Sequence, residues 1–173
     1  GISLASVKKF TIGVGDPAGA KSGATGMLYL DDIQFGKPAT LVNLATNGGF
    51  ETGAIAPWSA YGSTASTVTA CTGANVPEPP IEGKYCLDLK VSGPGTNFWD
   101  AGFSMSALPT FVNGAKYTLS AFFKVKSGTG KVNIKPEHAG GNWEGYGEQQ
   151  FTVTEKWVEY HVTTPVFTSD VSP

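Results

Sequence analysis

The sequence predicts an all-β fold, a β-sandwich. Segments with alternating side chains recur roughly every 8–15 residues, and glycine or proline separates them. No stretch of about ten or more residues carries the 3.6-residue period of a helix. The 23 glycines and 11 prolines among 173 residues suit short strands joined by turn-rich loops. Together these observations are typical of a sandwich rather than of an α/β fold.

Length and charge limit the function classes. A chain of 173 residues is long enough for one domain with its own core. Its net charge is −2 and it has no basic run, so neither nucleic acid nor an anionic membrane is an expected partner. No apolar run approaches the roughly 18 residues of a membrane span. The chain begins at Gly1 without a signal peptide, so we expect a piece of a longer protein.

The first two predicted strands are residues 7–13 and 27–35, with a loop rich in glycine and proline between them. We expect them to form a hairpin. In the second strand Leu28 and Leu30 share one side, but Asp31 and Asp32 interrupt the pattern. Two adjacent acids are unfavourable in a strand and need a reason. A hydrated sheet edge and a bound cation are the two alternatives.

The remaining strands follow from the same alternation. In residues 115–125, Tyr117, Leu119 and Ala121 oppose Thr118, Ser120 and Phe122. Ser127-Gly128-Thr129-Gly130 then reads as a tight hairpin turn. The other segments predicted to be extended are 41–44, 66–70, 84–91, 103–105, 131–136, 151–153 and 157–162.

The two cysteines lie at the ends of predicted neighbours. Cys71 ends the 66–70 segment, and Cys86 lies inside 84–91. If these segments pair antiparallel, the thiols meet, so we predict a disulfide and an oxidising compartment. The alternative is two small buried residues in a reduced protein.

The stretch from Trp143 to Phe151 concentrates chemistry suited to a sugar. It contains Trp143 and Tyr146, two carboxylates and two amides, with glycines before and inside it. Pyranose C–H faces stack on flat rings, while carboxylates and amides bond hydroxyls. The competing interpretation is that both rings cap the core beneath a loop.

The chain resembles the carbohydrate-binding modules of families four, nine and twenty-two over residues 41–173. The segments that carry the resemblance are Asn47-Gly48-Gly49-Phe50-Glu51-Thr52-Gly53 followed by Pro57-Trp58, Glu82-Gly83-Lys84-Tyr85-Cys86-Leu87, Gly114-Ala115-Lys116-Tyr117-Thr118-Leu119-Ser120, and Trp157-Val158-Glu159-Tyr160. The resemblance implies a β-sandwich jelly roll with a ligand cleft on one face. It further implies a secreted, extracellular, non-catalytic module that binds xylan, β-glucan or cellulose chains beside a glycoside hydrolase.

One departure from the family concerns the ends of the chain. Family members finish with a strand containing two aspartates, whereas this chain carries such a strand at residues 28–33. Residues 1–38 are then either the tail of a preceding tandem repeat or a hairpin that completes a permuted jelly roll formed by 39–173. A sandwich without its final strands exposes core and edges. We therefore expect the N-terminal hairpin to supply the terminal strands.

The resemblance also implies a structural calcium. The matching positions are Glu51, the carbonyls of Gly49 and Lys84, and Asp32. Calcium prefers six to eight hard oxygen ligands, which carboxylates and backbone carbonyls provide. The alternative is that Glu51 and Asp31 are solvated charges at a sheet edge.

For the ligand, the resemblance implies one aromatic platform near Trp99 and another near Trp143. Phe98 replaces Trp99 if the register differs by one. The polar contacts expected around the two rings come from Asn97, Tyr146, Glu148 and Gln150, the last three on one face of a strand. Trp58 and Trp157 are predicted to belong to the core.

Two other functions compete with sugar binding. Glu144 and Glu148 lie about 13 Å apart along a strand, farther than the carboxylates of either glycosidase geometry. No H-E-x-x-H, G-x-S-x-G or phosphate-loop motif occurs, so catalysis is disfavoured. A structural or adhesion sandwich of a large extracellular protein is the alternative function, and it predicts that Trp99 and Trp143 are buried.

Overall fold

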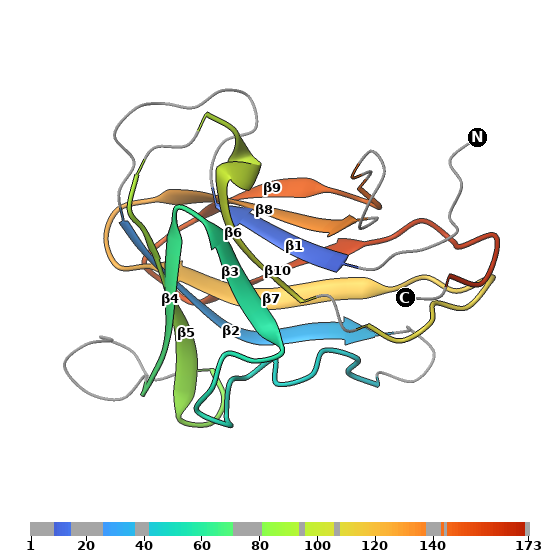
Figure 1. Cartoon of the computed structure of the whole chain (residues 1–173), viewed down its shortest axis with the longest axis horizontal. Coiled ribbons are helices and arrows are strands. Elements are labelled where there is room, and N and C mark those ends of the chain that lie inside the picture. The colour runs from blue at the N-terminus through green and yellow to red at the C-terminus, as the bar shows by residue number, and fades with distance from the viewer. Residues whose placement is uncertain are drawn as a thin grey trace.

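A computed structural model describes most of the chain, namely residues 9–14, 26–36, 42–70, 81–93, 96–105, 108–137, 143 and 145–171. Its elements, drawn in Figure 1, are β1 (Lys9–Val14), β2 (Gly26–Gly36), β3 (Trp58–Gly62), β4 (Thr64–Ala70), β5 (Tyr85–Val91), the 3₁₀ turn η1 (Phe98–Asp100), β6 (Ala101–Met105), β7 (Thr118–Val125), β8 (Gly130–Glu137), β9 (Gln149–Val153) and β10 (Val158–Thr163). Within these ranges no helix has the length and hydropathy needed to cross a membrane.

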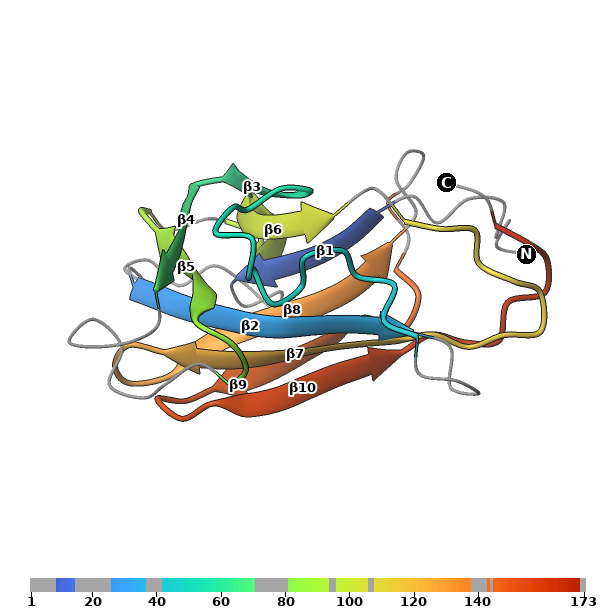
Figure 2. The ribbon, with the colours of Figure 1, turned by 90° about the horizontal axis from the view of Figure 1, so that it is seen from below.

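The strands form two antiparallel sheets of five strands each, which confirms the predicted all-β sandwich. Sheet A has the order β3-β6-β1-β8-β9, and sheet B has the order β10-β7-β2-β5-β4. Figure 2 shows the two layers after a quarter turn from Figure 1. Apolar side chains from both sheets meet between the layers and form one core.

The N-terminal segment occupies the centre of both sheets. β1 pairs with β6 and β8 in sheet A, while β2 pairs with β5 and β7 in sheet B. The expected hairpin is therefore wrong, although the segment does complete the sandwich. Ile12 of β1 and Leu30 of β2 are both fully buried. Each of the two strands has a paired neighbour on both sides, but in a different sheet.

The turn predicted at Ser127–Gly130 is not a hairpin turn either. It connects β7 of sheet B to β8 of sheet A, so the two strands that it joins do not pair. Alternation identified both strands correctly, but it carries no information about which sheet a strand enters. The connection crosses between layers, as is common in sandwiches.

The segment 47–58 supplies the aromatic centre of the core. Phe50 is fully buried, and Trp58 stacks on Phe103 with ring centroids 4.9 Å apart and 6° between the planes. The Trp58 indole donates a hydrogen bond to the carbonyl of Thr46 at 2.9 Å. The predicted core position of Trp58 is confirmed. The strand β3 that begins at Trp58 was not predicted, because the turn signal at Pro57 obscured it.

A bulge in β2 explains the two adjacent acids. The register against β7 shifts between Asp31 and Gln34, and Asp32 has a φ of 46°. One extra residue turns the following side chain inward, so Ile33 joins Leu28 and Leu30 in the core. Asp31 is left fully buried, and its Oδ1 accepts a hydrogen bond from the Asp32 amide at 2.8 Å.

Candidate functional site

Sheet A turns one face away from the core, and this outer face is rich in polar residues. Ile12 points into the core, so its neighbours Thr11 and Gly13 belong to the outer face. Pairing places two rows of residues across this face. One row is Tyr61, Gly102, Gly13, Asn133 and Gln150, and the other is Ser59, Ser104, Thr11 and Lys135.

Two glycines keep the middle of the outer face bare, and aromatic residues approach there. A Cβ on Gly13 would lie 2.6 Å from the carbonyl oxygen of Phe98, and one on Gly102 would overlap the hydroxyl of Tyr61. Phe98 is buried against this bare strip. The glycines therefore allow η1 to lie directly over β1, where it presents the next residue, Trp99, to solvent.

Trp99 stands on a turn held by Asp100. The Asp100 carboxylate accepts hydrogen bonds from the backbone amides of Asn97 at 2.8 Å and Thr96 at 2.6 Å. These bonds favour the charged form and hold the pKa of Asp100 below its ordinary value. The Trp99 ring contacts Phe98 edge-on, with 4.9 Å between centroids, yet remains 56% exposed. An exposed indole on a fixed turn can stack against a ligand.

Trp143 is the second exposed ring, with 48% of its surface accessible. Its φ of 55° lies in the left-handed region, which costs a non-glycine residue about 1–2 kcal/mol. The ammonium of Lys135 donates a hydrogen bond to the Trp143 carbonyl at 2.6 Å. This bond ties the residue to β8 and supports its unusual backbone.

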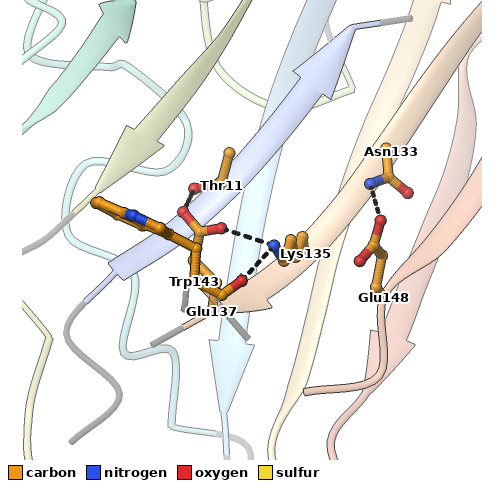
Figure 3. A network of polar contacts seen from close by, with 6 residues as sticks. All are labelled: Thr11, Asn133, Lys135, Glu137, Trp143 and Glu148. Atoms are coloured by element: carbon orange, nitrogen blue, oxygen red, sulfur yellow. Dashed lines mark hydrogen bonds and ion pairs between the residues drawn. The ribbon is translucent and has the colours of Figure 1, made fainter. Parts of the chain in front are cut away.

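Figure 3 shows Trp143 and the polar network beside it. Thr11 of β1 donates a hydrogen bond to Glu137, and Glu137 pairs with Lys135 at 3.2 Å. Farther along β8, the Asn133 amide donates to Glu148 at 2.7 Å. Burial is the main cause that raises the pKa of the Tyr61 hydroxyl, and the charge of Glu137 adds to it.

Asn133 has an acceptor that nothing satisfies. The residue is 1% exposed, and its Oδ1 has no hydrogen-bond partner among the described residues. A buried amide oxygen without a partner carries a desolvation cost, which the fold bears at this position of β8. Asn133 lies opposite Gln150 in the register and bonds to the exposed Glu148.

The structure places some predicted ligand residues at the surface. Trp99, Trp143, Asn97 and Glu148 are exposed, and Gln150 is half-buried. Prediction missed Thr11, Asn133, Lys135 and Glu137. The alternation of polar and apolar residues in 131–136 was a usable signal for two of them, whereas the contribution of Thr11 depends on the pairing of distant strands.

Phe98 and Tyr146 are placed differently from the prediction. Phe98 is only 7% exposed because it packs on the bare strip at Gly13. Tyr146 is 3% exposed and contacts Phe167 in the core, with 5.7 Å between centroids. Gly147, at a φ of 83°, breaks the extended alternation after it, so Tyr146 does not share a face with Glu148.

The residues predicted to hold calcium surround the β2 bulge. Both oxygens of Glu51 accept hydrogen bonds from the Lys84 amide at 3.0 Å, and one of them also bonds the Tyr85 amide. Asp32 is half-buried in the bulge, whereas Asp31 is fully enclosed. Among the described residues its Oδ2 has no hydrogen bond of normal geometry, although the backbone amides of Ile81 and Glu82 favour its charged form. Burial raises the pKa of Asp31 to about 7.

Within the described residues, no three His, Cys, Asp or Glu side chains gather around a common point. The predicted calcium ligands are of another kind, since the set contains two carboxylates, from Glu51 and Asp32, and two backbone carbonyls. Gly49 lies in the same loop as Glu51. The donor set therefore suits a hard cation of this type rather than a transition metal.

The cysteine and tryptophan predictions for sheet B have mixed outcomes. Cys86 is fully buried and disulfide-bonded. Its predicted partner, Cys71, lies outside the described residues, so the pairing stays a prediction. Trp157 is not in the main core; it packs half-buried against Tyr29 and Cys86 on the outer face of sheet B.

The fold and this face define a class of protein. The structure is a β-sandwich with two exposed indoles, Trp99 and Trp143, beside the polar outer face of sheet A. A family model described as a carbohydrate binding domain, covering classes four and nine, matches residues 42–172. The chain belongs to this family, whose modules are generally non-catalytic. Comparisons with curated proteins and with solved structures each returned no match.

Proposed function

We propose that the outer face of sheet A binds a chain of a β-linked plant polysaccharide, xylan or a β-glucan. Trp99 and Trp143 serve as stacking platforms for pyranose rings. Hydroxyl contacts come from Asn97, Glu148 and Gln150, and Asn133 supports Glu148 from below through its amide hydrogen bond at 2.7 Å. The exposure of both indoles, 56% and 48%, is the observation that carries the proposal.

Physical chemistry supports this assignment over a purely structural module. Indole rings are large apolar surfaces that folding normally buries, as it buries Trp58 at 3% exposure. Trp99 and Trp143 each keep about half of their surface exposed to solvent, and this apolar surface is available for stacking because it makes no core contact. A structural or adhesion module predicts both rings buried, and the observed exposure of Trp99 and Trp143 speaks against it.

The cellular setting belongs to the same proposal. Disulfides persist in oxidising compartments, so the bonded state of Cys86 supports an extracellular location. A non-catalytic binding face gains its use by holding another domain near the polymer, which supports tethering to a glycoside hydrolase. The effective concentration of that enzyme at its substrate would rise accordingly.

We also propose that the β2 bulge holds a structural calcium. Glu51, Asp31 or Asp32, and the carbonyls of Gly49 and Lys84 are the donors, and the buried carboxylate of Asp31 is the feature that fits a cation. The ion would tie β2 to the loop and turn beside it. Adding a chelator should lower the melting temperature, calcium should restore it, and Glu51→Gln should remove the response. A melting temperature indifferent to chelator would refute this.

Native affinity electrophoresis tests the polysaccharide proposal. Wild type, Trp99→Ala and Trp143→Ala run in gels containing xylan, mixed-linkage β-glucan, glucomannan or hydroxyethylcellulose. Retardation by one polymer that either substitution abolishes is the expected result. Trp157→Phe, on the opposite sheet, is the matched control and should migrate like wild type. Migration unaffected by every polymer would overturn the proposal.

A further inference from the structure

One ammonium group, that of Lys135, contacts both the Trp143 backbone and the Phe98 ring. Lys135 projects from β8 on the outer face of sheet A, opposite Thr11 in the register, and its side chain is 11% exposed. Its Nζ donates to the Trp143 carbonyl at 2.6 Å, pairs with Glu137 at 3.2 Å and lies 6.0 Å from the centroid of the Phe98 ring. The Lys135 ammonium thus contacts the backbone of Trp143 and the Phe98 ring against which Trp99 packs.

The contact with Trp143 acts on the backbone rather than on the ring. At a φ of 55°, Trp143 holds a conformation that few non-glycine residues adopt. Its carbonyl receives a charge-assisted hydrogen bond, which is about twice as strong as a neutral one. Figure 3 shows the indole directed away from Lys135, so the bond holds the backbone and does not involve the indole.

The contact with Phe98 reaches the other platform. The ammonium lies over the face of the Phe98 ring at a distance typical of cation–π attraction. Phe98 in turn touches the Trp99 ring edge-on. A displacement of Lys135 therefore reaches Trp99 through one intermediate side chain.

Glu137 fixes the position of the ammonium itself. Its side chain is 5% exposed, and its carboxylate accepts a hydrogen bond from the hydroxyl of Thr11 on β1. The carboxylate is thereby held between two adjacent central strands of sheet A. Lys135 extends from this rigid point, which suits a group that must hold two others in register.

We infer that Lys135 is a positioning residue that couples Trp99 and Trp143 and sets the spacing between the two stacking platforms. This inference rests on the proposed polysaccharide function for its consequence in binding. Its structural content, the joint ordering of two indoles by one ammonium, does not depend on which polymer binds. Preorganised rings lose less freedom on binding, so affinity falls when the coupling is removed.

Two variants and a matched control test the inference. Lys135→Met removes the ammonium but leaves Glu137 buried and unpaired, which threatens folding. Lys135→Met with Glu137→Gln removes both charges and keeps a group that accepts from Thr11. Lys131→Met is the control, because Lys131 is an exposed lysine of the same strand whose ammonium donates to the hydroxyl of Thr152 at 3.0 Å.

The first readout needs no ligand. The four tryptophans give four indole N–H signals in an NMR spectrum, assignable by single Trp→Phe substitutions. In the double variant we expect the Trp143 and Trp99 signals to shift and broaden, while Trp58 and Trp157 stay in place. Lys131→Met should leave all four unchanged. Unaltered Trp143 and Trp99 signals in the double variant would overturn the inference.

The second readout is affinity for xylohexaose and cellohexaose by titration calorimetry. The double variant should lose at least tenfold in affinity at an unchanged melting temperature, and Lys131→Met should stay within twofold of wild type. In a Trp143→Ala background, removing Lys135 should cost less than it does in wild type, because one platform is already gone. Wild-type affinity in the double variant would contradict the inference. If wild type itself binds neither sugar, the proposed function fails, and the indole signals alone decide on Lys135.

Discussion

The outer faces of the two sheets use aromatic residues in opposite ways. On sheet A, Trp99 and Trp143 are 56% and 48% exposed above a buried polar network. On sheet B, Tyr29 is 2% exposed in a small second cluster, and Trp157 packs against that cluster with Lys124 5.9 Å from its ring centroid. The aromatic residues on sheet B pack against each other and stabilise the fold, whereas those on sheet A keep about half of their surface in solvent. The two outer faces carry the same kinds of aromatic residue and differ in how much of each ring is exposed to solvent.

The largest expected effect lies on sheet B. Tyr29→Ala removes a buried ring and should lower the free energy of unfolding by about 3–5 kcal/mol. Urea denaturation followed by circular dichroism measures it. Polysaccharide retardation of the folded fraction should persist. A loss below about 1 kcal/mol would mean that the second cluster contributes little.

Removal of an exposed ring on sheet A should have almost no effect on the free energy of unfolding. Trp99→Ala should alter the free energy of unfolding by no more than about 0.5 kcal/mol, because the ring is mostly in water. Its affinity for the bound polymer should fall at least tenfold, the cost typical of a central aromatic anchor. Denaturation and calorimetry on one preparation separate the two quantities. Equal losses in both would erase the contrast between the faces.

Two glycines give an intermediate test. Gly13→Ala on β1 pushes a methyl group against the Phe98 carbonyl, 2.6 Å away, and should cost about 1–3 kcal/mol while displacing the turn under Trp99. Gly26→Ala on β2 meets no atom within 4 Å and should be neutral or stabilising by up to about 1 kcal/mol. Thermal unfolding of the two variants gives the comparison, and similar values for both would contradict the close packing of η1 on β1.

The smallest effect is a pair of opposite pH dependences. Backbone bonds from Asn97 and Thr96 lower the pKa of Asp100, whereas burial raises the pKa of Asp88 on sheet B against the pull of two lysines. The ionised Asp100 therefore stabilises the fold above its ordinary pKa of 3.8, and this is lost as the pH falls through the lower folded value. For Asp88 the contribution is present below 3.8 and is lost as the pH rises through the raised folded value.

Replacing each aspartate by asparagine measures the sign of its contribution to the free energy of unfolding. Asp100→Asn should destabilise at pH 7, with the difference from wild type vanishing in acid below the folded pKa. Asp88→Asn should stabilise at pH 7, and its advantage should also shrink as the pH falls. Chemical denaturation across pH 2–7 records the two curves, in a range set by these pKa values. Curves of the same sign would show that the two carboxylates do not differ in environment.

Local sequence patterns predicted most of the strands and the exposure of Trp99 and Trp143. Alternation of period two identifies buried and exposed positions within one strand, as in β7 and β8, because side-chain direction is a local property. Glycines and polar neighbours around Trp99 and Trp143 correctly indicated rings outside the core. The turn and strand context of Trp58 correctly indicated a ring inside it.

Tertiary structure alone decided which strands became neighbours, because pairing joins residues far apart in the chain. It separated β1 from β2 into different sheets and brought Thr11 against Glu137, 126 positions away. It buried Phe98 because Gly13, on another strand, leaves room above the sheet. Lys135 became the link between two indoles for the same reason. Local patterns encode which way a side chain points, whereas its partners depend on the packing of the whole chain.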